Sequence, residues 1–467
     1  MNEEQKVQKF AGITVAPDLK KSNYLFLYLN TLIMGMLMVM PAIVQPAFLQ
    51  DVIQVSPKYF GFINGFLQNM SQIATLAFVG IVGALSDKTG RKILAVIGFI
   101  VVGVFYYLFG QSVAIAEVLN ISEEFAAKVC AILNFAPAKY ADFLDFGPEL
   151  LVGYILRLIL GIGMILVYPQ FITMVADYTT NEKDRAKGMA FNGMMMGLAS
   201  IIIFAAVAPI GKNTGVGGLF VFATIMAFFG MIGTLLFLKE RLPEAQKEED
   251  KKSFRETFNV VIKSPSISSS CLCSLISRAD IAVMATFIIA WSVLQADVLE
   301  ITSEAATKKG AIPMIIMSVV TFLAFPVVAI LLNKLGRLKT IILTLFCGGI
   351  GFLMVALASS PFSGIVYFAV IPIGFCISGS IAGANTLATD VSPKAMVGAV
   401  LGWLNTAQPI GMLLFLQVGG YLFDVLGPGW AFGLKGCADI LLALWLFLVS
   451  KKINAELDSH KKAAAEN

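Results

Sequence analysis

Two oppositely charged residues, Arg278 and Asp280, lie near the middle of a long apolar stretch that runs from about residue 266 to 295. A stretch of this length can cross a bilayer as a helix, and a charged side chain there is costly unless it has a partner or faces a cavity. Positions two apart on a regular helix point about 200° apart, so both cannot face one cavity squarely. We therefore interpret one as a ligand contact and the other as the partner of a neighbouring helix. The alternative is a structural role for both.

A second buried charge is expected at Arg157, which lies in the apolar stretch 149–176. We interpret Arg157 as part of a binding or coupling site, with a structural salt bridge as the alternative. Asn64 and Gln68 fall four apart, on one face of another helix. Some of the polar residues in such stretches serve only to join helices. The predicted substrate and coupling residues are Arg278, Asp280, Arg157, Asn64, Gln68, Gln170, Asn385 and Gln408.

Few residues suited to enzyme chemistry are available. The single histidine, His460, lies in a polar tail, no Gly-x4-Gly-Lys-Ser/Thr loop occurs, and the six cysteines form no disulfide pattern. Methionines at 34–40 and 194–196 could bind copper(I), but alternate positions point to opposite sides of a helix, so an adaptable apolar lining is favoured. We expect no enzyme activity, no cofactor and no metal site. The net charge of +4 gives no indication of nucleic-acid binding.

The elements that must position these residues are long apolar segments. Hydrophobic residues make up 58% of the 467 residues and charged residues only 14%, which is too little charge for a soluble surface. The apolar residues recur in stretches that can each span a bilayer. We predict an all-α integral membrane protein with twelve transmembrane helices, at approximately 23–50, 58–85, 92–116, 149–176, 187–209, 217–238, 266–295, 311–333, 338–360, 363–389, 396–424 and 429–450.

A polar, Glu/Lys-rich segment divides these spans into two sets of six. Lys and Arg concentrate near the termini and in this segment, and we assign Lys435 with a few other lysines to the opposite loops. This bias predicts that both termini are cytoplasmic, in the plasma or inner membrane. The predicted parts are an N-terminal segment 1–22, a six-helix bundle 23–238, a linker 239–265, a second six-helix bundle 266–450 and a tail 451–467.

The loop 111–148 on the non-cytoplasmic side is long enough to contain a helix of its own. Ser122 can cap that helix, and Pro137 would end it. Phe125, Val129, Ile132 and Leu133 line one face at helical spacing, which predicts an amphipathic helix. We interpret the helix as resting on the membrane surface, with a partial lid over the outer mouth as the alternative.

The turn between the second and third spans, residues 83–92, reads GALSDKTGRK. It matches every fixed position of the pattern G-x-L-x-D-x-x-G-R-K, and the chain thereby resembles the major facilitator superfamily, which carries this pattern at the same place. A weaker copy occurs at 329–337, where Arg337 aligns with Arg91, and Asp390 similarly aligns with Asp177. The resemblance implies two pseudo-symmetric six-helix bundles that expose a central cavity to each side of the membrane in turn.

The resemblance also implies a conformational latch. In this superfamily the carboxylate at the position of Asp87 meets the N-terminus of the eleventh span in the outward-open state. Here Ser392 would be the N-cap of that helix and Pro393 its first residue, and the helix dipole would attract Asp87. Arg91 is within reach of Asp87 if the turn is compact. The predicted gating residues are Gly83, Asp87, Gly90, Arg91, Asp177, Arg185 and Ser392.

The expected function is gradient-driven transport of a small organic solute. Two arginines against one acid within the spans favour an anionic or zwitterionic substrate, and we expect proton coupling. Leu198 replaces the proline of the family's antiporter pattern, which makes a drug/proton antiporter less favoured. The alternatives are an exporter of hydrophobic or amphiphilic compounds and a non-transporting receptor or scaffold. The expected partners are the substrate, protons and the lipid bilayer, with the protein as a monomer.

Overall fold

The structure is a computed structural model, and it describes residues 8–179, 181–241, 254–296, 298–392 and 396–466. Within these residues, twelve helical segments are long and apolar enough to cross a membrane, so the predicted all-α membrane fold is confirmed. Much of the predicted linker 239–265 lies outside the described residues. The helices are α1 (Lys21–Asp51), α2 (Phe60–Thr89), α3 (Arg91–Gly110), α4 (Ser112–Leu119), α5 (Glu123–Leu133), α6 (Gly147–Tyr178), α7 (Glu182–Phe237), α8 (Phe254–Lys263), α9 (Pro265–Ser277), α10 (Asp280–Leu294), α11 (Ser303–Lys334), α12 (Arg337–Ala356), α13 (Gly364–Val391), α14 (Val397–Leu426) and α15 (Gly429–Glu466).

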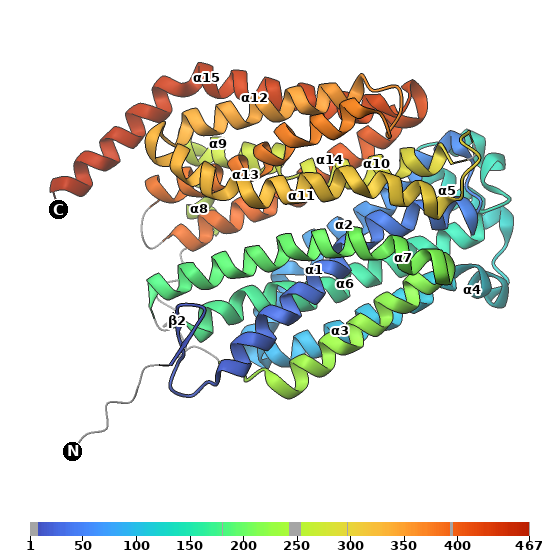
Figure 1. Cartoon of the computed structure of the whole chain (residues 1–467), viewed down its shortest axis with the longest axis horizontal. Coiled ribbons are helices and arrows are strands. Elements are labelled where there is room, and N and C mark those ends of the chain that lie inside the picture. The colour runs from blue at the N-terminus through green and yellow to red at the C-terminus, as the bar shows by residue number, and fades with distance from the viewer. Residues whose placement is uncertain (1–7, 180, 242–253, 297, 393–395, 467) are drawn as a thin grey trace. The chain divides into compact units, whose positions relative to one another are not determined.

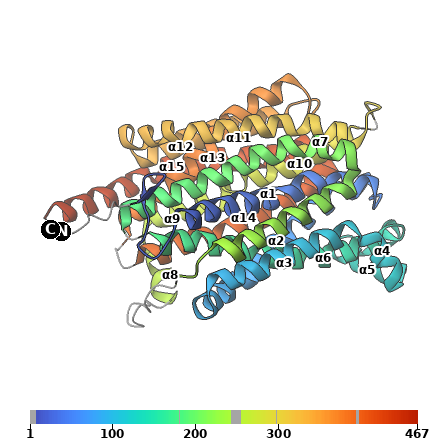
Figure 2. The ribbon, with the colours of Figure 1, turned by 60° about the horizontal axis from the view of Figure 1, so that its bottom comes forward.

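The chain forms two compact units. The first contains Met1–Val44, Val52–Gln54 and Ile73–Ala245, and the second contains Gln45–Asp51, Val55–Gln72 and Gln246–Asn467. The end of α1 and the first part of α2 therefore belong to the second unit, which the sequence pattern did not predict. Within the first unit α3 packs against both α6 and α7 (Figure 1). Within the second unit α12 packs against α13 and α15, and α9 packs against α13 and α14 (Figure 2).

Two turns that the repeated pattern aligned have the same backbone conformation. Gly90 precedes α3 with φ +96°, and Gly336 precedes α12 with φ +90°. These values lie in the region where a Cβ atom causes strain, so glycine is the residue that fits both turns. The correspondence of residues 83–92 with 329–337 is therefore visible in the structure of the two turns.

The seventh predicted span is broken at its charged pair. The prediction was one continuous helix over 266–295, but α9 ends at Ser277 and α10 begins at Asp280. Arg278 and Ala279 lie between the two helices, with ψ near −10° at each instead of a regular helical value. The argument from a regular 100° step therefore does not apply across this pair, and each residue needs to be placed from its own contacts.

The loop helix is present as α5, and the protein covers its apolar stripe only in part. Ser122 does cap α5, since its Oγ accepts the Phe125 N–H at 3.4 Å. Phe125 and Ile132, however, are about 60% exposed, and the buried residues are Ala126, Ala127, Cys130 and Ala131. The reason is close packing, because small side chains let α5 approach α6 at Gly147, where the Ala127 backbone leaves no room for a Cβ. The membrane-surface and lid interpretations of α5 stay predictions.

The N-terminal segment contains a hairpin that was not predicted. Strands β1 (Lys9–Phe10) and β2 (Ile13–Thr14) pair in antiparallel fashion, and the ring of Phe10 stacks on those of Tyr24 and Tyr28. The Thr14 N–H donates to Asp184 Oδ2 at 3.0 Å, which attaches the hairpin to the first turn of α7. Strands this short give almost no period-2 signal in a sequence, so the pattern could not reveal them.

Candidate functional site

Arg278 is the predicted binding residue around which the structure gathers other predicted residues. Its guanidinium donates to Asn385 Oδ1 at 2.7 Å, to Asn405 Oδ1 at 2.9 Å and to Gln408 Oε1 at 3.1 Å. These amides come from α13 and α14, and Arg278 itself is half-buried at the junction of α9 and α10. Amide oxygens orient a guanidinium without adding a negative charge to it. The arrangement is suited to presenting a cation to a ligand.

The close approach of α14 to the end of α9 makes these contacts possible. At Gly411, one turn after Gln408, a Cβ would overlap the Leu275 carbonyl oxygen. Only glycine therefore allows the two backbones to meet there, and this brings Asn405 and Gln408 within reach of Arg278. Asn385 and Gln408 were predicted site residues in two different spans, but the pattern offered no means to pair them with one arginine, and Asn405 was not among the predicted residues.

Asp280 does not share the surroundings of Arg278. Its carboxylate forms an ion pair with Lys435 on α15, and Lys435 Nζ also donates to Asp439 Oδ1 at 2.5 Å. All three side chains are fully buried. Placing Lys435 in a loop was wrong, and Asp439 was missed. An i,i+4 Lys–Asp pair inside the apolar stretch 429–450 was the available signal, because such a pair can neutralise itself within a helix.

The remaining predicted binding residues divide between the units. Asn64 is buried in the second unit, where its Oδ1 accepts from Gln45 Nε2 at 2.6 Å and its Nδ2 donates to the Thr286 carbonyl at 3.1 Å. These bonds join α1, α2 and α10, so the structure gives Asn64 a helix-joining role. Gln68 is half-buried one turn further along α2. Arg157 and Gln170 are both buried in α6 of the first unit.

The predicted gating residues of the first unit include an ion pair. Arg91 pairs with Asp177, and both side chains are nearly buried. The Glu240 carboxylate, which was not predicted, accepts the backbone N–H groups of Arg91 at 3.0 Å and Lys92 at 2.7 Å, so it caps the start of α3. The aligned pair in the second unit also forms, with Arg337 Nε donating to Asp390 Oδ2 at 2.9 Å.

Other parts of the latch prediction have different outcomes. Ser392 is not the N-cap of the eleventh span, because α14 begins at Val397 and the Ser392 hydroxyl instead donates to the Ala388 carbonyl at the end of α13. Pro393 lies outside the described residues, and the side chain of Asp87 is not described. Gly83 lies within α2 with open space around it, and Arg185 is exposed in the first turn of α7.

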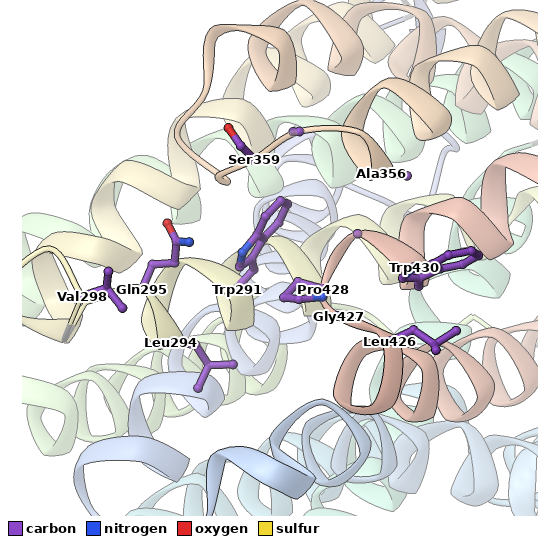
Figure 3. A pocket seen from close by; sticks show the side chains of 12 residues that line it. Trp291, Leu294, Gln295, Val298, Ala356, Ser359, Leu426, Gly427, Pro428 and Trp430 are labelled. Carbon is purple, nitrogen blue, oxygen red and sulfur yellow. The ribbon is translucent and has the colours of Figure 1, made fainter.

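A cavity of about 520 Å³ lies in the second unit, away from these residues. Figure 3 shows Trp291 of α10, Gln295 directly after α10, Ser359 and the segment from Leu426 to Trp430 around it. None of the predicted site residues lines this cavity. Its polar groups are few and uncharged, so its lining gives no indication of a charged ligand.

Comparisons with known proteins agree with this architecture. A sequence model described as Major Facilitator Superfamily matches residues 27–414 and 283–466. Among curated proteins, the magnetosome protein MamH of Paramagnetospirillum magneticum is 24% identical over 437 residues, which cover 94% of each chain. The magnetosome protein MamZ of the same organism is 24% identical over 97% of this chain, which corresponds to 66% of the MamZ length.

Solved structures show the same fold. A mutant of the nucleoside transporter NupG superposes with a TM-score of 0.69 at 11% identity, covering 91% of this chain and 99% of that one. A D-xylose-proton symporter gives 0.63 at 16% identity, covering 91% and 97%. A bacterial homologue of the lysosomal transporter Spinster gives 0.61 at 14% identity, covering 96% and 98%. With twelve membrane-spanning helices and a family match over most of its length, the chain belongs to the Major Facilitator Superfamily of membrane transporters.

Proposed function

We propose that the protein is a secondary active transporter of a small organic anion or zwitterion, working by alternating access, with Arg278 as the contact for the negative group of the substrate. The observation that carries this proposal is the set of three amide oxygens around Arg278, on α13 and α14. Amides hold the guanidinium fork in one orientation and leave its charge in place, and a fixed fork suits a carboxylate or phosphate.

The charge count that first favoured an anion needs correction. The count of two arginines against one acid inside the spans was wrong, because Lys435 and Asp439 add one charge of each sign inside α15. Asp424 adds another carboxylate in α14, where it accepts the N–H groups of Gly61 and Phe62 at 2.7 and 2.8 Å. The proposal therefore rests on the local arrangement at Arg278 and not on an overall excess of positive charge.

Proton coupling and orientation are part of the same proposal. One structural neighbour is a nucleoside transporter and another a D-xylose-proton symporter, which supports a small organic solute, and the second supports coupling to protons. The names of MamH and MamZ mention no substrate and do not narrow the choice. With Lys435 removed from the loops, the remaining Lys/Arg bias favours cytoplasmic termini more strongly than before. We propose a monomer in the cell membrane.

The test is ligand binding to the purified protein, read by thermal shift with a panel of anionic, zwitterionic, neutral and cationic solutes. Solutes with a carboxylate or phosphate should stabilise the wild type. Arg278→Ala should weaken that binding about 10- to 150-fold, the equivalent of a charge-assisted hydrogen bond of about 1.5–3 kcal/mol. Arg278→Lys should fall between the two, because it keeps the charge but loses the fork.

Lys128→Ala is the control, since Lys128 is an exposed cation on α5 and its loss should leave binding unchanged. A folded Arg278→Ala protein with wild-type affinity would remove Arg278 from the site. Stabilisation by hydrophobic or amphiphilic compounds alone would favour an exporter of such compounds. Substrate flux in liposomes then distinguishes a transporter of either kind from a non-transporting receptor.

A further inference from the structure

The buried charges on α10 and α15 form a cluster that the substrate proposal does not use. Asp280 begins α10, and Lys435 and Asp439 lie one turn apart on α15. Lys435 Nζ contacts both carboxylates and lies 5.1 and 5.3 Å from the ring centres of Phe352 and Phe415. All of the charged side chains are fully buried. The cluster is therefore a charged site enclosed by apolar and aromatic groups.

The charges of this cluster do not balance. Two carboxylates and one ammonium carry a net charge of −1 when all are ionised, and a net charge is costly in an apolar membrane interior. Asp439 Oδ2 is also buried without a hydrogen-bond partner among the described residues. One proton makes the cluster neutral, and on Asp439 Oδ2 it removes the charge from an oxygen that accepts no hydrogen bond.

The other titratable groups that face the cluster are thiols. The Cys376 Sγ of α13 lies within 4.8 Å of carboxylate oxygens of both Asp280 and Asp439. Cys273 of α9 is buried near Asp439. The elements α12 and α14 contribute the rings of Phe352 and Phe415. Neither a thiol nor a ring supplies a positive charge, so Lys435 is the cation of the cluster.

Two carboxylates and a thiol could also bind a metal ion, but the centre of this set is occupied. The ammonium of Lys435 contacts both carboxylates, at the position that a bound cation would need. A metal ion would therefore have to displace a fully buried lysine, at the cost of leaving the ammonium unpaired. A proton needs no such displacement.

We propose that Asp280, Lys435 and Asp439 form a proton-binding site, in which the two carboxylates share one proton and Lys435 remains charged. On binding, one proton from water converts the cluster from −1 to neutral, and on release the proton returns to water. The proton-binding site does not depend on the proposed transport function. We also identify its proton as the coupling ion, and this second step rests on that function. Asp280 follows the break that contains Arg278, so a shift of this junction on substrate binding would reach both sites.

The direct test is infrared spectroscopy of the purified full-length protein, which detects the C=O stretch of a protonated carboxyl group. The wild type should show this band near neutral pH. Asp439→Asn and Asp280→Asn should each abolish it, because one carboxylate then balances Lys435. Lys435→Met should strengthen it, because both carboxylates then need a proton. All spectra are recorded in an Asp424→Asn background, because the buried Asp424, held by two backbone N–H groups outside the cluster, adds a band of its own when it is protonated. Asp390→Asn is the control, since Asp390 pairs with Arg337 where water reaches both side chains.

The coupling is tested separately in liposomes. Asp439→Asn should lose uptake driven by a pH gradient but keep substrate exchange, which needs no proton release. Failure of the wild type to transport anything would overturn the proposed function while leaving the infrared test intact. A carboxyl band that is absent, or present in every variant, would overturn the proton site. A metal-binding site would also overturn it. Its sign would be a rise in the melting temperature of the wild type with Zn²⁺ or Mn²⁺ that is absent in Asp439→Asn.

Discussion

The two Arg–Asp pairs of this chain show how similar residues acquire different energetic roles. Arg91 and Asp177 have side chains that are 5% and 7% exposed, whereas those of Arg337 and Asp390 are 33% and 37% exposed. The sequence alignment of the two halves treated these pairs as equivalent. Burial makes the difference, because water compensates a broken pair at the surface and cannot do so in the interior.

This contrast gives a prediction at the residue scale. Asp177→Asn replaces the nearly buried charge-assisted hydrogen bond to Arg91 with a neutral one, and should destabilise the protein by about 1.5–3 kcal/mol. Asp390→Asn, its matched control, breaks a pair that water reaches and should cost about 1 kcal/mol or less. Thermal unfolding of both variants in one detergent checks this. Equal decreases in melting temperature would contradict the assignment of separate roles.

At the scale of elements, apolar length predicted the helices well, and local packing decided what it could not predict. The break at Arg278 and Ala279 contains neither glycine nor proline, so no breaker residue marked it in the sequence. On α5, small residues form the close contact with α6 and bulky ones are left outside, which the apolar stripe did not predict. In both places the outcome depends on neighbouring helices, which a single-sequence pattern does not contain.

The N-terminal hairpin gives a prediction about pH. The Thr14 backbone N–H, with Asn181 and Lys187, donates hydrogen bonds that hold the pKa of Asp184 well below its ordinary value. A lowered folded-state pKa means that Asp184 stabilises the attached hairpin above its unfolded pKa of about 3.9, and that this contribution is lost as the pH falls further. The hairpin should therefore stay attached between pH 7 and pH 5.

Hydrogen exchange at the Thr14 amide, corrected for its intrinsic rate, measures this attachment. Protection should be similar at pH 7 and pH 5 in the wild type and should fall at both in Asp184→Asn, which cannot carry the charge. Glu124→Gln is the control, since it removes a carboxylate that pairs with the exposed Lys128 on α5. Protection that survives in Asp184→Asn would show that the Phe10 ring contacts suffice to hold the hairpin.

At the scale of the whole molecule, the family fold supplies two units, and the proposals assign them different tasks. Arg278 and the cluster at Asp280 both lie in the second unit, whereas the buried Arg91–Asp177 pair and its cap Glu240 lie in the first. Binding and coupling chemistry would thus be concentrated in one half. The turn that carries the family pattern would then control the conformational exchange, without contributing to ligand recognition.

That division predicts the effect of Asp87→Asn. If Asp87 is attracted to the start of the eleventh span, removing its charge should weaken the outward-open state by about 0.3–2 kcal/mol, which is about a 2- to 30-fold change in the conformational ratio. Labelling of Gln68→Cys from outside with an impermeant reagent, in a cysteine-free background, should slow accordingly. Transport should fall while substrate affinity at Arg278 is kept.

Asn333→Ala is the control. It alters the position that aligns with Asp87 in the second half, where the charge is already missing, and should leave labelling unchanged. Equal labelling rates with and without the Asp87 charge would show that this carboxylate is not the latch.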